Sequence, residues 1–446
     1  MDKNKINFQI APAGSGACER CGAQTEELFH VTLSRGGETN AHDLCRNCAA
    51  VAKRFAEKSN REAPAEREAA PEQPAPTQPP KKSKLPLVLL VVFVAVAVIA
   101  VAVGFGMNKK PTDEPAETTA APTESTAAPT TAAPTTAPEP PDEDVDDSLI
   151  QKLSSLLIVD DAGYEYYNFS KATAERYAKA VNQTAASLKG TARVFDIVVP
   201  TSMDITLADP VRQRITSTDD QKKAIDTIYA AISSDCVTVD TFDTLRAHRK
   251  EYIYFRTDHH WTALGAYYAY REFTAAAGLR TAELDEFTER KFENFVGAFY
   301  QDSGKNKALE KNPDTVYAYE PKETNEMTYT DRKGREVKWN IVTDVSKWSR
   351  GTLYNTFIGG DNPYAYICYP KETDWASCVV IKESFGNAFV PFLLANYNEI
   401  HIIDYRYWKG DLDSFVRSTG VQDVIFVNNI SATRNAALVN NLENIL

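Results

Sequence analysis

The segment FRTDHHWTALGAYYAY, residues 255–270, places Asp258, His259, His260 and Trp261 side by side at the start of a helical pattern. The residues just before them, EYIYFRT, have the aromatic and β-branched character of a strand. If the chain stays extended through the cluster, side chains alternate between faces, so Asp258 and His260 point one way and His259 the other. That arrangement disfavours a metal site built from all three residues. It also puts a carboxylate beside an imidazole, the pair that prepares a serine for nucleophilic attack.

The helical part of this segment has its own start and stop signals. Apolar residues at helical spacing run from about Thr262 to Ala277, and Gly278 follows them. We expect Thr262 to cap the helix and Trp261 to pack beneath it. In an alternative interpretation, Asp258 is the cap and the histidines are ordinary hydrogen-bonded polar residues.

Around this segment, short strands alternate with helices through the C-terminal part of the chain. Helical patterns occupy residues 172–188, 221–233, 387–398 and 412–418, and strand patterns occupy residues 192–200, 236–240, 364–370, 377–383, 399–404 and 421–428. This alternation predicts an α/β fold, a three-layer sandwich with a mainly parallel sheet. The stretch 327–342 contains a Lys-Gly turn and predicts an antiparallel hairpin, which we interpret as an appendage.

A second reactive position lies at the end of one of these strands. The strand pattern 377–383 ends just before Ser384, and Gly386 loosens the turn into the next helix. In parallel α/β sheets, functional residues gather at the carboxyl ends of the strands. A serine there lies near a helix N-terminus, where backbone N–H groups are free to stabilise a developing oxyanion.

Several motifs, taken in order, resemble a known family. The chain contains FDIVVPT (195–201), RTDHHWT (256–262), FVGAFY (295–300), FIGGDNPY (357–364), IKESFGNAFVPFLL (381–394) and IHIIDYRYW (400–408). This order resembles the DHHW family of bacterial cell-surface proteins, which is similar to the SGNH-like domain of alginate O-acetyltransferases. The resemblance covers residues 148–446 and implies an SGNH-hydrolase-like fold. In one departure, KE precedes the serine, where SGNH hydrolases have GD and DHHW proteins more usually have D.

The resemblance also implies roles for individual residues. Ser384 would be the nucleophile, His260 its general base and Asp258 the residue that orients the base. Arg406 would be a basic group near the site. Asn387 and Gly360 would be oxyanion donors or substrate contacts, although each could equally be a turn residue. No cofactor is expected for catalysis.

The N-terminal third of the chain has a different composition. Residues 85–107 form an uncharged apolar run that would be about 34 Å long as a helix, enough to cross a bilayer. Residues 59–84 predict a disordered linker and the Pro- and Thr-rich residues 108–147 a disordered stalk. Lys and Arg are more frequent before the apolar run than after it, which favours a cytoplasmic N-terminus.

The first residues of the chain contain two C-x-x-C pairs, CERC and CRNC. Their thiols belong to Cys18, Cys21, Cys45 and Cys48. Four thiolates in this pattern suit a tetrahedral structural zinc ion, so residues 1–58 are predicted to form a zinc-ribbon-like cytoplasmic module. A disulfide pair or a redox dithiol is the alternative.

These features together predict a single-pass cell-membrane protein whose domain at 148–446 lies outside the cell. The expected function is that of a serine esterase or O-acetyltransferase acting on cell-envelope or extracellular polysaccharide. The resemblance implies a membrane-bound O-acyltransferase as a partner. A catalytically inactive glycan-binding module is the alternative, and a sensor whose zinc module recruits a cytoplasmic partner is a third hypothesis. The net charge of -12 disfavours a nucleic-acid-binding protein.

Overall fold

The computed structural model describes residues 7–17, 24–35, 38–45, 49, 53, 144–369 and 376–446 of the 446-residue chain. The predicted linker (59–84), membrane helix (85–107) and nearly all of the predicted stalk (108–147) lie outside the described residues. Within the described part of the chain, no helix is both long enough and apolar enough to cross a membrane. The predicted linker, membrane span and stalk therefore stay predictions.

The N-terminal residues form a small antiparallel sheet. Its strands, in the order β1-β2-β3, are β1 (Asn7–Ala17), β2 (Gln24–Arg35) and β3 (Glu38–Cys45). The predicted zinc ligand Cys45 is the last residue of β3, whereas Cys18, Cys21 and Cys48 lie outside the described residues. The zinc site also stays a prediction.

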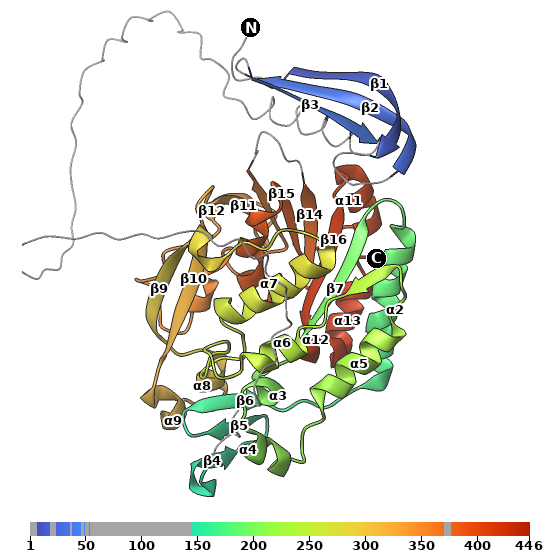
Figure 1. Cartoon of the computed structure of the whole chain (residues 1–446). Coiled ribbons are helices and arrows are strands. Elements are labelled where there is room, and N and C mark those ends of the chain that lie inside the picture. The colour runs from blue at the N-terminus through green and yellow to red at the C-terminus, as the bar shows by residue number, and fades with distance from the viewer. Residues whose placement is uncertain are drawn as a thin grey trace, which may run out of the picture. The chain divides into compact units, whose positions relative to one another are not determined.

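The C-terminal part of the chain is built around an eight-stranded mixed sheet (Figure 1). In spatial order its strands are β12 (Glu336–Asn340), β11 (Glu326–Thr330), β13 (Tyr364–Cys368), β15 (Glu399–Asp404), β14 (Ser377–Lys382), β16 (Asp423–Asn429), β7 (Arg193–Val199) and β8 (Cys236–Thr238). The strands from β15 to β8 run parallel to one another, and those from β12 to β15 pair antiparallel. The predicted hairpin at 327–342 is present as β11 and β12, but it is not an appendage, because β11 pairs with β13 and extends the main sheet.

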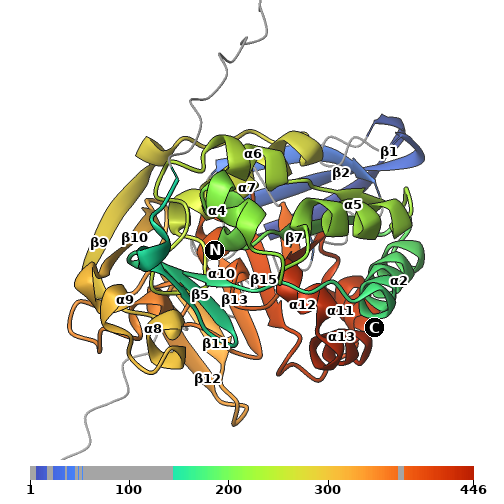
Figure 2. The same ribbon diagram turned by 90° about the horizontal axis from the view of Figure 1, so that it is seen from below.

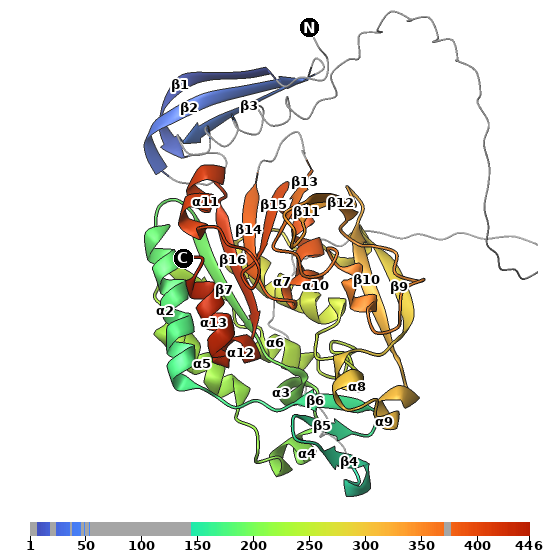
Figure 3. The ribbon, with the colours of Figure 1, turned by 180° about the vertical axis from the view of Figure 1, so that it is seen from behind.

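Both faces of this sheet are buried, so the domain has three layers. Along β14, Cys378 and Val380 belong to one apolar core, and Val379 and Ile381 belong to the other. The first core contains side chains of α7 (Ala263–Ala277), α10 (Gly386–Phe389) and the 3-10 helix η4 (Val390–Ala395), with the hairpin β9 (Phe287–Phe295) and β10 (Asp314–Pro321). The second contains side chains of α2 (Lys171–Ser187), α5 (Gln221–Ala231), α11 (Leu412–Thr419), α12 (Ile430–Arg434) and α13 (Ala436–Glu443) (Figures 1 and 3).

The remaining elements are short. A three-stranded sheet of β4 (Ile150–Lys152), β5 (Leu156–Val159) and β6 (Ala162–Glu165) contacts α3 (Ser202–Ile205) and α9 (Lys307–Lys311) (Figure 1; β5 and α9 are also labelled in Figure 2). The other short helices are α4 (Asp209–Arg214), α6 (Phe242–Ala247), α8 (Ala298–Asp302), η1 (Asp147–Leu149), η2 (Leu284–Glu286) and η3 (Leu353–Thr356).

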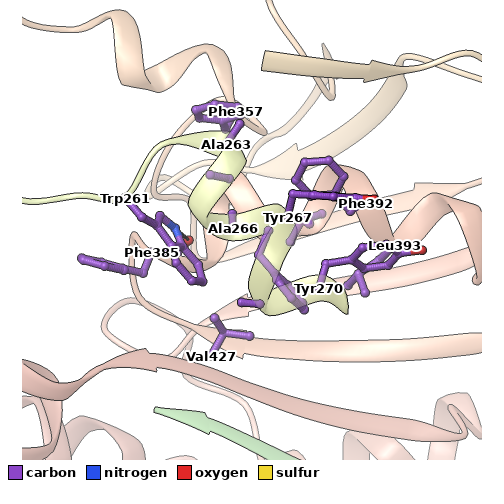
Figure 4. Close-up of a cluster of buried hydrophobic side chains, with 14 of the residues drawn as sticks. Trp261, Ala263, Ala266, Tyr267, Tyr270, Phe357, Phe385, Phe392, Leu393 and Val427 are labelled. Carbon is purple, nitrogen blue, oxygen red and sulfur yellow. Dashed lines mark hydrogen bonds between the residues drawn. The ribbon is translucent and has the colours of Figure 1, made fainter. Parts of the chain in front are cut away.

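Helix α7 forms as its sequence signals predict. The Thr262 hydroxyl oxygen accepts a hydrogen bond from the Gly265 N–H at 3.3 Å, and Gly278 ends the helix in the left-handed conformation, with φ of 68°. Trp261 is fully buried beneath the helix, and Figure 4 shows it beside Phe385. The helix predicted at 387–398 is instead α10 followed by η4, since Pro391 cannot donate the backbone hydrogen bond that a longer α-helix needs.

Candidate active site

The DHHW residues lie on a bent loop, not on an extended strand. Tyr254 and Trp261 pair as an isolated antiparallel bridge, and the Phe255 N–H donates to the His260 carbonyl at 3.2 Å, so the intervening residues turn back on themselves. The prediction that His259 faces away from its neighbours is therefore wrong. Its ring centroid lies 3.9 Å from that of His260, because alternation of faces holds only where the chain is extended.

Asp258 is held by three hydrogen bonds. Its Oδ1 accepts from the His260 backbone N–H at 3.0 Å and lies 2.6 Å from His260 Nδ1, and its Oδ2 accepts from the Ala298 N–H at 2.7 Å. Burial alone would raise the pKa of Asp258, but His259, His260 and these hydrogen bonds hold it well below its usual range. The buried group is thus an ionised carboxylate, and it accepts a hydrogen bond from the protonated Nδ1 of His260.

Gly297 makes room for this carboxylate. A Cβ atom at position 297 would lie 2.1 Å from Asp258 Oδ2 and 2.3 Å from Asp258 Cβ. The glycine of the FVGAFY motif therefore allows the backbone before α8 to come close enough for the Ala298 N–H to reach Asp258.

Ser384 lies at the other end of the hydrogen-bond chain. It follows β14 by two residues and precedes α10, and its Oγ is 2.8 Å from His260 Nε2. The Trp261 indole N–H donates to the Phe385 carbonyl at 3.0 Å, which ties the DHHW loop to the turn that carries the serine. The structure thus brings together Asp258, His260 and Ser384, the three residues predicted to act as a unit.

The ligand atoms of Asp258, His259 and His260 lie within 4.8 Å of one another, a spacing that could hold a metal ion. However, the Asp258 carboxylate and the two ring nitrogens of His260 already have hydrogen-bond partners in the chain to Ser384. The donor set therefore fits a proton relay better than a metal site.

The ring of Tyr354, from η3, holds the His260 imidazole in place. The two rings stack with centroids 3.9 Å apart and planes inclined by 12°, and the Tyr354 hydroxyl donates to the Ser384 carbonyl at 3.0 Å. Burial, assisted by the neighbouring His259, lowers the pKa of His260 to about 4 despite the opposing effect of Asp258. His260 is thus neutral at physiological pH. Sequence reasoning missed Tyr354, because no motif spacing links it to the histidine.

Glu383 is a second residue that sequence reasoning missed. Its Oε2 lies 3.2 Å from Ser384 Oγ and accepts from the Phe385 N–H at 3.2 Å, and its Oε1 accepts from the Asn429 N–H at 2.9 Å. The unusual KES sequence was the only signal. Backbone N–H groups at the start of this helix were expected to be free for an oxyanion. Instead, the Phe385 N–H donates to the Glu383 carboxyl group, and the Gly386 N–H donates to the Glu383 carbonyl at 3.1 Å.

The three weaker predicted site residues lie around Asp361. Asp361 accepts from Asn387 Nδ2 at 3.1 Å, and its carboxylate is 2.9 Å from Arg406 Nη2. Gly360 precedes it in a turn with φ of 78°. Asp361 also lies 3.2 Å from Nζ of the buried Lys382, which in turn contacts Asp404 at 3.0 Å. Arg406 and Asn387 therefore belong to a charged network beside the serine turn.

A separate pocket is lined in part by Arg256 and Thr262, which flank the DHHW sequence. Its volume is about 460 Å³, and its lining is largely aromatic and polar: Tyr252, Arg256, Thr262, Leu264, Glu289, Thr315, Tyr317 and Tyr319. None of the predicted catalytic or oxyanion residues lines it.

Known proteins resemble this chain in sequence and in fold. The family described as DHHW protein matches residues 141–403, which is more than half of the chain. The chain belongs to the DHHW family. The family predicted from the motifs is thereby confirmed. A search of curated proteins finds no match.

Solved structures of similar fold include another member of the DHHW family. The DHHW family protein from Eubacterium siraeum DSM 15702 is 27% identical, with a TM-score of 0.61 over 69% of this chain and 99% of that one. Bacillus cereus PatB1 is 18% identical, with a TM-score of 0.54 over 65% of this chain and 98% of that one. The O-acetyltransferase domain of Pseudomonas putida AlgJ is a more distant neighbour, 12% identical, with a TM-score of 0.32 over 65% of this chain and 96% of that one. The first two likenesses show that the mixed α/β fold is shared.

Proposed function

We propose that the C-terminal domain is a serine esterase or O-acetyltransferase that acts on cell-envelope or extracellular polysaccharide. The observation that carries the proposal is the continuous hydrogen-bond chain from Asp258 through His260 to Ser384. A carboxylate, an imidazole and a serine hydroxyl at these distances can activate the hydroxyl as a nucleophile. The scheme uses no cofactor.

In the first half of the proposed reaction, Ser384 Oγ attacks the acyl carbonyl while His260 Nε2 takes the hydroxyl proton. The bond between the carbonyl carbon and the leaving oxygen then breaks, and His260 returns the proton to that oxygen. Asp258 stays ionised and stabilises the imidazolium that forms between these steps. The product is an acyl ester on Ser384.

In the second half, a sugar hydroxyl or a water molecule attacks the ester, again with His260 as the base. Attack by a sugar completes a transfer, and attack by water completes a hydrolysis. The buried Asn387 Oδ1 has no hydrogen-bond partner among the described residues, so we assign to Asn387 a contact with the sugar or water that accepts the acyl group. Arg406 is paired with Asp361 and contributes positive charge near the site without contacting the serine.

A serine-reactive fluorophosphonate tests this proposal on the purified chain. Labelling should map to Ser384 and disappear in Ser384→Ala and His260→Ala, because nucleophile and base act as one unit. Ser418→Ala, an exposed serine on α11, is the matched control and should label normally. A sulfonyl fluoride is a second probe, since PatB1 has been solved with a sulfonyl adduct. An unlabelled Ser384 would refute the enzymatic proposal.

A glycan-binding module is the second candidate function, and the pocket with three tyrosines favours it. Tyr317 and Tyr319 are alternate residues of β10 and face the same side of the hairpin, so their rings can offer apolar surface to a sugar beside Arg256 and Glu289. Polysaccharide binding that survives Ser384→Ala and is lost in Tyr317→Ala would favour this function.

The setting of the domain is proposed on the sequence alone. We propose that residues 85–107 anchor the protein in the cell membrane, with a cytoplasmic zinc module at 1–58 and the C-terminal domain outside. A membrane-bound O-acyltransferase would then supply the acyl group. Protease added to intact cells should release a soluble fragment that begins within residues 111–146. Cleavage within residues 59–84 instead would reverse the orientation.

A further inference from the structure

Glu383 is the second polar neighbour of the Ser384 hydroxyl. It is only 3% exposed, and the Asn429 N–H, at the end of the adjacent parallel strand β16, fixes one of its carboxyl oxygens. The other oxygen, Oε2, lies 3.2 Å from Ser384 Oγ and accepts the Phe385 N–H. The carboxyl group is therefore held in place by backbone groups on both sides and directed at the serine.

The protons available to these groups determine which way each hydrogen bond runs. His260 Nδ1 faces the Asp258 carboxylate, which can only accept, so Nδ1 carries the proton of the neutral ring. Nε2 is then an acceptor, so its 2.8 Å contact with Ser384 Oγ is a hydrogen bond when the single hydroxyl proton points at Nε2 and not at Glu383. Under this arrangement the serine has no proton left for Glu383. The 3.2 Å contact is a hydrogen bond only if Glu383 carries a proton and donates it to Ser384 Oγ.

The surroundings of Glu383 favour this neutral form. Burial raises the pKa of Glu383 and Asp361 raises it further, whereas Arg406 and the two backbone N–H groups act in the opposite direction. The titratable or charged side chains that interact with this carboxyl group include Arg406, Asp361, Tyr354 and Tyr405, and His260 shares the Ser384 hydroxyl with it. Lys382, on the same strand, is paired with Asp361 and Asp404.

We infer that Glu383 is a positioning residue whose neutral carboxyl group donates to Ser384 Oγ and so directs the serine proton to His260 Nε2. This inference rests on the proposed function of Ser384. When Glu383 loses its proton, its carboxylate becomes an acceptor and competes with His260 for the serine proton. Ser384 is then turned away from its base and loses reactivity.

The same hydrogen bond would act again when the acyl group leaves the serine. As the bond between the acyl carbon and Oγ breaks, the electron pair moves to Oγ, which takes its proton from the imidazolium of His260. The Glu383 O–H hydrogen bond stabilises the developing charge on Oγ, and Glu383 keeps its own proton. Glu383 thus assists both halves of the reaction without being consumed or exchanged.

The test is the rate of fluorophosphonate labelling of Ser384 as a function of pH, measured on the whole purified chain. In the wild type, the rate should rise as His260 becomes neutral and fall tenfold per pH unit once Glu383 ionises. Glu383→Gln, which cannot ionise, should keep the rise and abolish the fall, whatever its rate between them, because an amide nitrogen in place of Oε2 can donate to Ser384 Oγ but cannot accept the Phe385 N–H. Glu383→Met, which can neither donate nor accept, should label at least tenfold more slowly than the wild type at pH values where Glu383 is protonated, and its rate should not fall at higher pH. Glu326→Gln, an exposed glutamate on β11, is the matched control and should behave as the wild type.

A wild-type rate that stays flat up to the pH of unfolding would overturn the inference without any variant being needed. An identical fall in the wild type and in Glu383→Gln would also overturn it, since another group would then be responsible. Either result, with Ser384 still labelled, leaves the proposed function standing. If Ser384 is not labelled at any pH, both the inference and the proposed function fail.

Discussion

Replacement of Gly297 by Ala should disable the site by displacing Asp258. The new Cβ would lie 2.1 Å from Asp258 Oδ2, whereas a carbon and an oxygen in contact stay about 3.3 Å apart, so the carboxylate must move by about 1 Å. The contact to His260 Nδ1 would then lengthen from 2.6 Å to about 3.6 Å, beyond hydrogen-bond range. A misplacement of about 1 Å costs roughly 10²-fold in rate, and complete loss of the orienting carboxylate costs about 10⁴-fold. The labelling rate of Ser384 should therefore be reduced by a factor of roughly 10² to 10⁴.

The Ala298 N–H would also lose its acceptor in this variant, at a cost of about 1–3 kcal/mol in the free energy of unfolding. The assay combines the fluorophosphonate labelling rate with thermal unfolding, so that a folded but unreactive protein is distinguished from an unfolded one. Gly351→Ala is the matched control. A Cβ there meets its nearest atom, the Val296 carbonyl oxygen, at an ordinary 3.5 Å. A folded Gly297→Ala protein that labels at the wild-type rate would refute the assigned role of Asp258, as would an equal loss in the control.

Three other outcomes are expected, the first two from the structure and the third from the sequence. The labelling rate of Ser384 should rise through pH about 4 as His260 becomes neutral. Because His259 helps to lower the pKa of His260, His259→Gln should move this rise to higher pH, and an unmoved rise would contradict the contact between the rings. Lys382→Met should lower the free energy of unfolding by about 3–5 kcal/mol, since it leaves the Asp361 and Asp404 carboxylates to share Arg406 alone in a buried place. The exposed Lys333→Met should change the free energy of unfolding by less than about 0.5 kcal/mol, and similar chemical denaturation curves for both variants would refute the network. The purified chain should carry about one zinc ion, measured by elemental analysis and lost in Cys45→Ser; a metal-free but folded N-terminal sheet would exclude the zinc ribbon.

Much of the fold was predictable because its signals are local. The start of α7 at Thr262 and its end at Gly278 depend on hydrogen bonds within one or two turns, so a capping hydroxyl and a glycine suffice to indicate them. The strand at 377–383 has four consecutive apolar residues, Cys378 to Ile381, because both faces of a sheet between two helical layers are buried, and that pattern is visible in the sequence. The hairpin at 327–342 was predicted because its Lys-Gly turn is also a local signal. Its pairing with β13 was not, because pairing depends on a distant strand.

The amino-acid sequence by itself determined which residues could form the site: the D-x-H spacing, the serine at the end of a strand and the order of motifs that marks the DHHW family. Only the tertiary structure decided their directions and partners. The bridge between Tyr254 and Trp261 bends the loop and turns His259 toward His260, and the stacking of Tyr354 on that imidazole joins residues far apart in the chain. The proton arrangement at Ser384 likewise depends on Glu383, whose role arises from burial and from the N–H of a neighbouring strand. Side-chain orientation, burial and proton position are set by contacts between segments that are distant in sequence, and such contacts exist only once the chain has folded.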